Sequence, residues 1–332
     1  MVRAARLADQ LGYDVFAVPE GWGLDSTAVL AEIALRTERI RLVSGVLSVW
    51  SRTPGTLAMT AATLDQISGG RYVLGLGAST AALTEGFHDV PFVHPAEQLA
   101  HTLDGVRALL AGNPARLRNS PDARPLRLGV TPAPAVPIWL AALGPRALRI
   151  AAERADGWFP ALVARDQLSA LIAGLAAAAG TGEERRRPFT VAAGPLAVVG
   201  EDSRAARDIA ASCIAWYVCA MGDVYAESLT RQGYSAEVAA VRAANPRPRP
   251  GTGRIPAAAE ALLDQLAATG TREQVRAQLD RWDDLADIVM LGLPPGLPWP
   301  AIEASLRAAA PERPIPGGPE RAVPALAGRG RS

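Results

Sequence analysis

Small residues directly after an apolar segment mark the first place in this chain where chemistry is expected. Residues 72–76 form a short apolar run typical of a strand covered on both faces, and the sequence then reads Gly-Ala-Ser-Thr. Small residues at the carboxyl end of a strand expose backbone N–H groups and hydroxyls, which suit a phosphate or a flavin. The cofactor cradle expected here consists of Gly77, Ala78, Ser79 and Thr80. A Rossmann turn is the alternative, but Thr80 stands where that motif has its third glycine.

A second stretch of small residues follows the apolar segment 138–142. It ends a predicted strand and opens a predicted helix. Backbone N–H groups at a helix start lie at the positive end of the helix dipole and form a natural phosphate site. Arg146 or Arg149 could pair with an anion there, and a solvated arginine is the alternative. The residues expected at this second site are Ala142, Leu143, Gly144, Pro145 and Arg146.

Three acidic or imidazole side chains could transfer protons or contact a substrate. Glu20 follows the predicted strand 13–18, where a carboxylate held in a structural salt bridge is the alternative. Glu85 and His88 lie in the loop after the glycine turn. Histidine is the side chain best suited to proton transfer near neutral pH, although a lone loop histidine is often only solvated.

Predicted strands and helices alternate along the chain, which favours parallel strands joined by helical crossovers. One helix has clear local signals at both ends, with Thr53-Pro54 at its start and Gly69 at its stop. The predicted strands cover residues 13–18, 40–47, 72–76, 138–142, 157–160, 189–199 and 288–293. The predicted helices cover residues 3–11, 26–37, 54–68, 95–110, 145–154, 167–179, 205–242 with a break near Gly233, 257–268 and 273–282.

The composition excludes several functional classes. The 332 residues carry a net charge of +1, which provides no overall field for nucleic acid or an anionic membrane. No apolar run reaches about 18 residues, and the N-terminus lacks the apolar core of a secretory signal. Cys213 and Cys219 lie six apart in a helical stretch, which favours neither a disulfide nor a metal site, so a reducing cytoplasm is expected. The chain has no lysine, which excludes a Schiff base and a P-loop.

Residues 61–77, A-A-T-L-D-Q-I-S-G-G-R-Y-V-L-G-L-G, resemble the signature of the bacterial luciferase-like superfamily, in particular its coenzyme F420 branch. The similarity continues in residues 85–92 and 137–158, and a weaker similarity extends to about residue 293. The resemblance implies a (β/α)8 TIM barrel that moves a hydride between F420 and a small organic substrate, such as an imine, enone or carbonyl compound. An FMN-dependent monooxygenase is the alternative, and a non-catalytic flavin-binding barrel is a second alternative. The resemblance also implies a homodimer.

The resemblance assigns roles to individual residues. It implies a non-prolyl cis peptide at Gly45-Val46 behind the flavin ring, where an ordinary strand end is the alternative. It implies that the cofactor phosphate binds at the 142–146 turn. Related deazaflavin dehydrogenases have Asp-His after the second strand, whereas this chain has Glu20 followed by Gly21 and Trp22. Proton transfer is therefore expected from Glu20 or His88, and Trp22 and Glu85 are expected to contact the substrate.

The family barrel has eight strands, and seven are predicted here. The family's first strand normally precedes the helix that begins here at about Arg3, so we expect that the true start lies upstream of Met1. Mass spectrometry of a native protein that begins at Met1 would refute this. Residues 1–310 are expected to form one domain, with insertion loops at about 112–136 and 243–256, followed by a disordered tail at 311–332.

Overall fold

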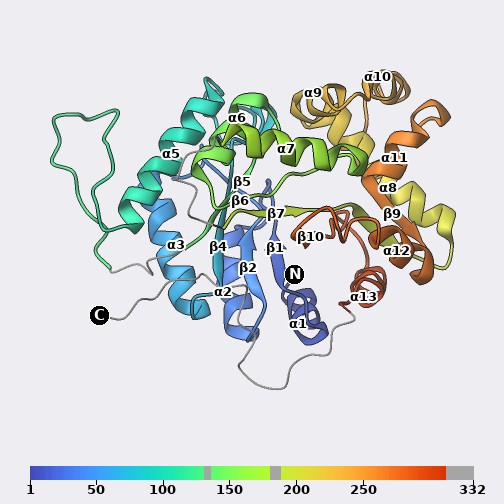
Figure 1. Cartoon of the computed structure of the whole chain (residues 1–332), viewed down its shortest axis with the longest axis horizontal. Coiled ribbons are helices and arrows are strands. Elements are labelled where there is room, and N and C mark those ends of the chain that lie inside the picture. The colour runs from blue at the N-terminus through green and yellow to red at the C-terminus, as the bar shows by residue number, and fades with distance from the viewer. Residues whose placement is uncertain (131–135, 180–187, 312–332) are drawn as a thin grey trace.

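The computed structural model describes residues 1–130, 136–179 and 188–311, and within them seven parallel strands form one curled sheet in chain order (Figure 1). A further short strand, β3 (Leu47–Ser48), pairs with β4 at the carboxyl end of β2. The seven strands are β1 (Val15–Val18), β2 (Arg41–Ser44), β4 (Tyr72–Gly77), β5 (Ile138–Ala141), β6 (Gly157–Trp158), β7 (Thr190–Ala193) and β10 (Ile288–Val289). The predicted α/β barrel architecture is therefore confirmed.

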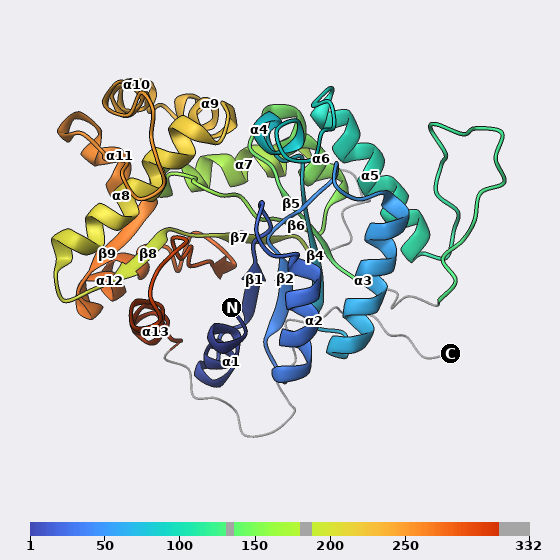
Figure 2. The same cartoon turned by 180° about the vertical axis from the view of Figure 1, so that it is seen from behind.

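Helices cover the outer side of this sheet because each presents an apolar stripe to it (Figure 2). They are α1 (Val2–Leu11), α2 (Ser26–Arg36), α3 (Pro54–Ser68), α5 (Pro95–Leu110), α6 (Pro145–Arg154) and α7 (Leu168–Ala178). The predicted ends of α3 are confirmed. The Thr53 hydroxyl accepts a hydrogen bond from the N–H of Thr56, and Gly69 adopts the left-handed conformation at φ 67°. All six residues of β4 are buried, as its apolar sequence predicts.

The sheet does not close between its two ends. Within the described residues β1 and β10 are the edge strands and do not pair with each other. Helix α13 (Trp299–Ala308), which was not predicted, packs against α1 on this side. The Arg3 guanidinium lies 3.8 Å from the centre of the Trp299 ring, and the Tyr13 hydroxyl donates a 2.7 Å hydrogen bond to the Leu306 carbonyl.

Two strand predictions need correction. The predicted strand 189–199 is two strands, because Gly194-Pro195 interrupts it and Pro195 has no N–H to donate. Gly194 lies so close to the Met290 backbone that no side chain would fit. The second part, β8 (Leu196–Val199), pairs with β9 (Ala267–Gly270) in a separate sheet, although residues 267 and 268 were predicted to be helical.

The helical region after β8 also differs from the prediction. Residues 205–242 contain three helices, α8 (Ser203–Ala220), α9 (Val224–Arg231) and α10 (Ser235–Ala244). The break at Gly233 is confirmed, whereas the break at Gly222 was missed. Both glycines have positive φ, at 98° and 80°. Two further helices, α11 (Glu260–Leu266) and α12 (Arg272–Leu279), complete this side of the molecule.

The described parts of the expected loops 112–136 and 243–256 contain no helix or strand, apart from the end of α10. The expected disordered tail lies outside the described residues from residue 312 onward. No described helix is by itself long and apolar enough to cross a bilayer; α8 and α9 meet that criterion only as a pair, which is bent by 104°.

The crossing of β2 and β4 yields a stability prediction. A Cβ atom at Gly75 would overlap the Ser44 carbonyl, which belongs to the neighbouring backbone and cannot move independently. We expect Gly75→Ala to lower the free energy of unfolding by about 3 kcal/mol in urea titrations. The control is Gly55→Ala in α3, where the nearest atom would be 3.7 Å away and stability should stay the same or rise. Equal stability of the two variants would contradict this account.

Candidate functional site

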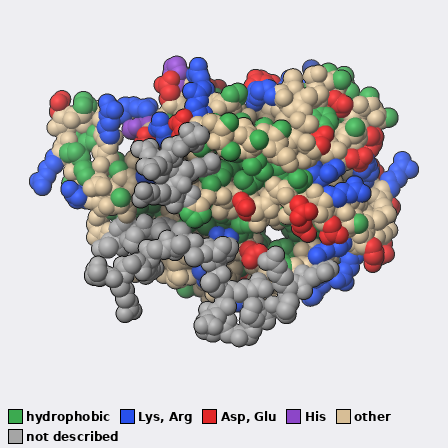
Figure 3. All heavy atoms as spheres, viewed as in Figure 1, with side chains coloured by type: hydrophobic (Ala, Val, Ile, Leu, Met, Phe, Trp, Pro, Cys, Tyr) green, Lys and Arg blue, Asp and Glu red, His purple; other side chains and the backbone are tan. Residues whose placement is uncertain are grey.

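The carboxyl ends of the parallel strands open into one cavity of about 2160 Å³. Val46, Ser79 and Gly144 all line it, although they come from three separate strand ends. The same cavity reaches Tyr13 and Leu306 at the side where β1 and β10 do not pair. Hydrophobic side chains gather in the hollow at the centre of one face of the molecule (Figure 3). The strand ends therefore meet at one hollow.

The floor of the cavity is formed where β2 ends against β4. The peptide bond between Gly45 and Val46 is cis, as the resemblance implied. The Ser44 hydroxyl donates to the Gly75 carbonyl at 3.0 Å and accepts from the Gly75 N–H at 2.8 Å. A Cβ at Gly77 would lie only 2.7 Å from a methyl of Val46. The glycines of β4 therefore allow the close approach of the Gly45-Val46 segment, which explains them without a Rossmann turn.

The turn after β4 presents an unsatisfied hydroxyl. Ser79 has a positive φ of 60°, and Thr80 precedes the short helix α4 (Ala81–Thr84). Thr80 is only 6% exposed and lines the cavity, but its hydroxyl has no hydrogen-bond partner within the described residues. The Ala78 carbonyl is already fixed by the Trp50 indole N–H at 2.8 Å. Buried hydroxyls are normally paired, so the Thr80 hydroxyl is an exception at this turn.

The start of α6 forms the opposite side of this cradle. Gly144, Pro145 and Arg146 line the cavity together with Leu143. Gly144 has ordinary extended angles, and a Cβ placed there would meet no atom within 4 Å. The N-terminus of α6 is thus open to an anion. Ala142 is different, because it is fully buried and its carbonyl accepts a 2.8 Å bond from the Trp158 indole. It supports the turn from behind and does not line the cavity.

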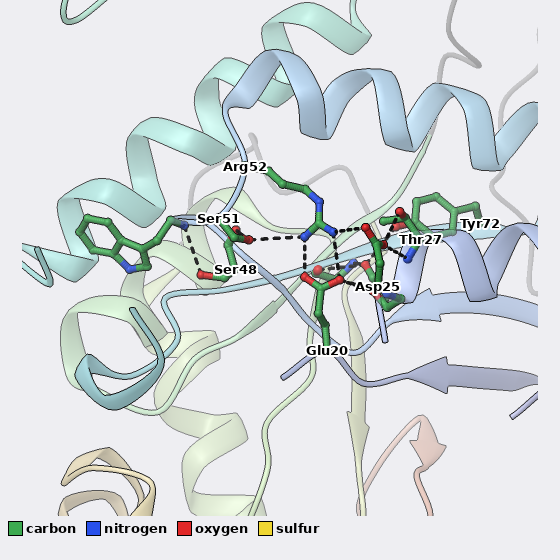
Figure 4. Close-up of polar contacts among 11 residues, drawn as sticks. Glu20, Asp25, Thr27, Ser48, Ser51, Arg52 and Tyr72 are labelled. Carbon is green, nitrogen blue, oxygen red and sulfur yellow. Dashed lines mark hydrogen bonds and ion pairs between the residues drawn. The ribbon is translucent and has the colours of Figure 1, made fainter. Parts of the chain in front are cut away.

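Glu20 is held by an ion pair at the end of β1 (Figure 4). One carboxylate oxygen accepts from the N–H and the hydroxyl of Ser26, at 3.1 and 2.9 Å, and from the Arg52 guanidinium at 3.0 Å. The other oxygen also accepts from Arg52. Arg52 reaches Asp25 as well, at 3.2 Å. Burial alone would lower the pKa of Arg52, but Glu20 and Asp25 outweigh it and raise that pKa. These contacts match the salt-bridged alternative for Glu20.

Of the other three predicted site residues, two line the cavity and one does not. His88 and Trp22 line the cavity, and the His88 ring packs edge-on against Phe87 at 5.0 Å between ring centres. Glu85 does not line the cavity. Its side chain is exposed, and its carboxylate accepts a 3.1 Å bond from the N–H of Phe92, which braces the loop. The expected substrate contact of Glu85 therefore gains no support from its position.

Sequence reasoning missed a whole wall of the cavity. It comes from α8, α9 and the turn between them. These residues were predicted only to be helical, because nothing in that stretch of the sequence indicates which face of the helix lines a cavity. Burial raises the pKa of the Cys213 thiol to about 11, so this group stays protonated near neutral pH. The wall is formed by Ser212, Cys213, Trp216, Tyr217, Met221 and Tyr225.

Comparisons with known proteins agree with this geometry. The family model for luciferase-like monooxygenases matches residues 1–287. A Mycobacterium tuberculosis protein with a provisional assignment as a coenzyme F420-dependent oxidoreductase is 31% identical over 83% of this chain and 85% of its own length. A 4-hydroxyprotoasukamycin monooxygenase of Streptomyces nodosus is 36% identical, but over only 33% of this chain and 31% of its own length. The structure of the F420-dependent tetrahydromethanopterin reductase of Methanopyrus kandleri matches 93% of both chains with a TM-score of 0.69 and 20% identity.

The ion pair at the end of β1 yields a second prediction. The side chains of Arg52 and Glu20 are only 15% and 13% exposed, so removal of one leaves the other charge poorly solvated. In a double-mutant cycle of Glu20→Gln and Arg52→Met we expect a coupling energy of about 2 kcal/mol in chemical unfolding. The exposed pair of Glu303 and Arg307, treated in the same way, should give less than about 0.5 kcal/mol. Similar coupling in both pairs would argue against a special role for the β1 pair.

Proposed function

Because this chain belongs to the luciferase-like monooxygenase family, we propose that it is an oxidoreductase that transfers a hydride between coenzyme F420 and a small organic substrate. The F420 assignment is supported by the match to the mycobacterial relative over most of both chains. The observation that carries the proposal is the cavity in which Val46, Ser79 and Gly144 meet. A tricyclic ring with a phosphorylated tail needs a support for the ring, polar groups beside it and a site for the phosphate, all in one cavity.

The residues of the cavity fit such a cofactor part by part. The Gly45-Val46 segment would support the ring, and the hydroxyls of Ser79 and Thr80 would bind polar groups beside it. The open N-terminus of α6 at Gly144 would bind the phosphate, and Arg146 would pair with the anionic tail. The cofactor supplies the hydride, so the work of the protein is to orient the ring and substrate and to exclude water.

Proton handling is assigned to His88 in this proposal. His88 lines the cavity, and imidazole exchanges protons near neutral pH. Glu20 is a positioning residue in this scheme. Its carboxylate already accepts hydrogen bonds from Arg52 and Ser26, so it holds the end of β1 and the segment after it in place.

A reduced-FMN monooxygenase is the second candidate. The observation that favours it is the 36% identity of 115 residues to the Streptomyces monooxygenase. The two candidates differ in the ring that the cavity accepts and in whether oxygen is consumed.

We also propose a homodimer that is formed through α2 and α3. These helices pack against each other and carry three large apolar side chains that are exposed in the single chain, namely Leu35, Met59 and Ile67. Light scattering coupled to gel filtration should give twice the chain mass, and Leu35→Arg should reduce it to one chain. The matched control is Leu126→Arg, at an exposed leucine outside this face. A wild-type mass of one chain at all concentrations would refute the dimer.

Cofactor titration tests the main proposal. Purified protein should change the fluorescence of F420 at micromolar concentration and affect FMN much less. Gly144→Leu should weaken F420 binding at least about tenfold, because the new side chain occupies open space where the phosphate would bind, while the extended angles of this position tolerate leucine.

The control for this variant is Gly174→Leu in α7, at an exposed position that does not line the cavity. It should bind F420 like the wild type. Tight FMN binding together with oxygen uptake driven by reduced FMN would instead favour the monooxygenase. Unchanged F420 affinity in Gly144→Leu would contradict the phosphate site.

A further inference from the structure

The wall formed by α8 and α9 lies directly against the proposed cofactor cradle. The turn between the two helices contains Gly222, and a Cβ placed there would lie 3.5 Å from the Cβ of Thr80. Tyr217 precedes this turn and Tyr225 follows it, and both line the cavity. A molecule bound against this wall would therefore lie beside the turn that ends β4, where hydride transfer is proposed.

Two tyrosines of this wall differ from the other tyrosines of the chain. The chain has five, and three of them donate a hydrogen bond to protein groups: Tyr13 to Leu306, Tyr72 to Ser44 and Tyr234 to Asp166. Tyr217 and Tyr225 have no such partner within the described residues. Their rings pack edge-to-face with centres 5.0 Å apart, which fixes the two rings relative to each other. Half-buried phenols without a partner in the protein are suited to bind a ligand oxygen.

A third hydroxyl on the same wall is also unsatisfied. Ser212 is only 6% exposed and lines the cavity, and its hydroxyl has no partner within the described residues. It lies one helical turn before Trp216, which contributes an aromatic surface to the cavity. The wall thus combines flat apolar rings with the two tyrosine hydroxyls, as expected for a ligand with a ring and an oxygen atom.

The charges of the cavity argue against an anionic substrate. Among the described residues that line it, the arginines are Arg146 and Arg276, and the histidines are His88 and His94. Arg146 lies at the proposed phosphate site, and Arg276 donates to the Ala310 carbonyl near α13. The acids of the α9 side are paired with arginines, Asp223 with Arg242 at 2.6 Å and Glu227 with Arg231 at 3.6 Å. The described residues of α8, α9 and the turn between them that line the cavity therefore include no arginine or histidine to bind a carboxylate or phosphate.

We propose that Tyr217 and Tyr225 bind the substrate, and that it is an uncharged, ring-containing ketone or enone whose carbonyl oxygen accepts hydrogen bonds from these phenols. This inference rests on the proposed function. As a hydride from reduced F420 adds to the carbonyl carbon, the electron pair of the C=O π bond moves to the oxygen, which then takes the proton that His88 handles. Hydrogen bonds to that oxygen strengthen as its charge grows. Burial raises the pKa of both phenols, so they remain neutral donors at physiological pH.

The test uses the complex with oxidised F420, in which a ketone binds without turnover. Acetophenone is titrated by calorimetry into the wild type, Tyr217→Phe, Tyr225→Phe and the double variant. We expect the affinity to fall about five- to tenfold in at least one single variant and further in the double variant. F420 affinity should change less than about twofold. Tyr234→Phe, which lies outside the cavity, is the matched control and should bind acetophenone like the wild type.

A second pair of probes tests the charge of the substrate. 4-Acetylbenzamide and 4-acetylbenzoate have nearly the same shape, but only the second carries a negative charge at pH 7. We expect the amide to bind at least about tenfold more tightly, because the wall provides no cation for the carboxylate. Equal or tighter binding of the carboxylate would overturn the substrate class.

Failure of this inference and failure of the proposed function give different results. Loss of F420 binding in the wild type would overturn the proposed function, and acetophenone binding could still be measured on the protein alone. Normal F420 binding with unchanged acetophenone affinity in the double variant would overturn only the role of the two tyrosines. No acetophenone binding to the wild type at its solubility limit would overturn it as well.

Discussion

The floor of the cavity depends on the close contact between the end of β2 and the middle of β4. There is no room for a side chain at Gly75, and almost none at Gly77, because the Ser44 carbonyl and the Val46 side chain occupy that space. The Ser44 hydroxyl, bonded to Gly75 and to the Tyr72 phenol, holds the two strands at this distance. The Gly45-Val46 segment thereby lines the cavity, where it would contact a ligand bound at the strand ends.

The polar groups around the cavity fall into two classes, those bonded within the protein and those without a partner. At β1 the Glu20 carboxylate is bonded to Arg52 and Ser26, so its polar atoms already have partners within the protein. At Thr80, Ser212 and the α6 terminus, by contrast, donors are left without partners in the described protein. Glu20 therefore belongs to the groups that shape the site. The groups without a partner are those left to bind a ligand.

Sequence signals were sufficient where the cause of a structure is local. Pro145 and the apolar spacing after it defined α6 to the residue, and Thr53 and Gly69 defined α3. Local signals failed where distant contacts decide. The split between β7 and β8 follows from the packing of Gly194 against Met290, and β9 is a strand because β8 pairs with it. The partner of Glu20 is 32 residues away in the sequence, and the cavity face of α8 is defined only by the turn at Gly222, so neither could be read from spacing alone.

The contact between α1 and α13 has a consequence for the order in which the structure forms. The hydrogen bond from Tyr13 to Leu306 joins residues that are 293 positions apart. Contacts of such long sequence separation form late, because a long loop must close first. During synthesis α1 stays without the packing of α13 until α13 has left the ribosome. Until then the apolar side chains of Ala4 and Leu7, which cluster with Leu306, remain exposed, and exposed apolar surface favours aggregation of the nascent chain.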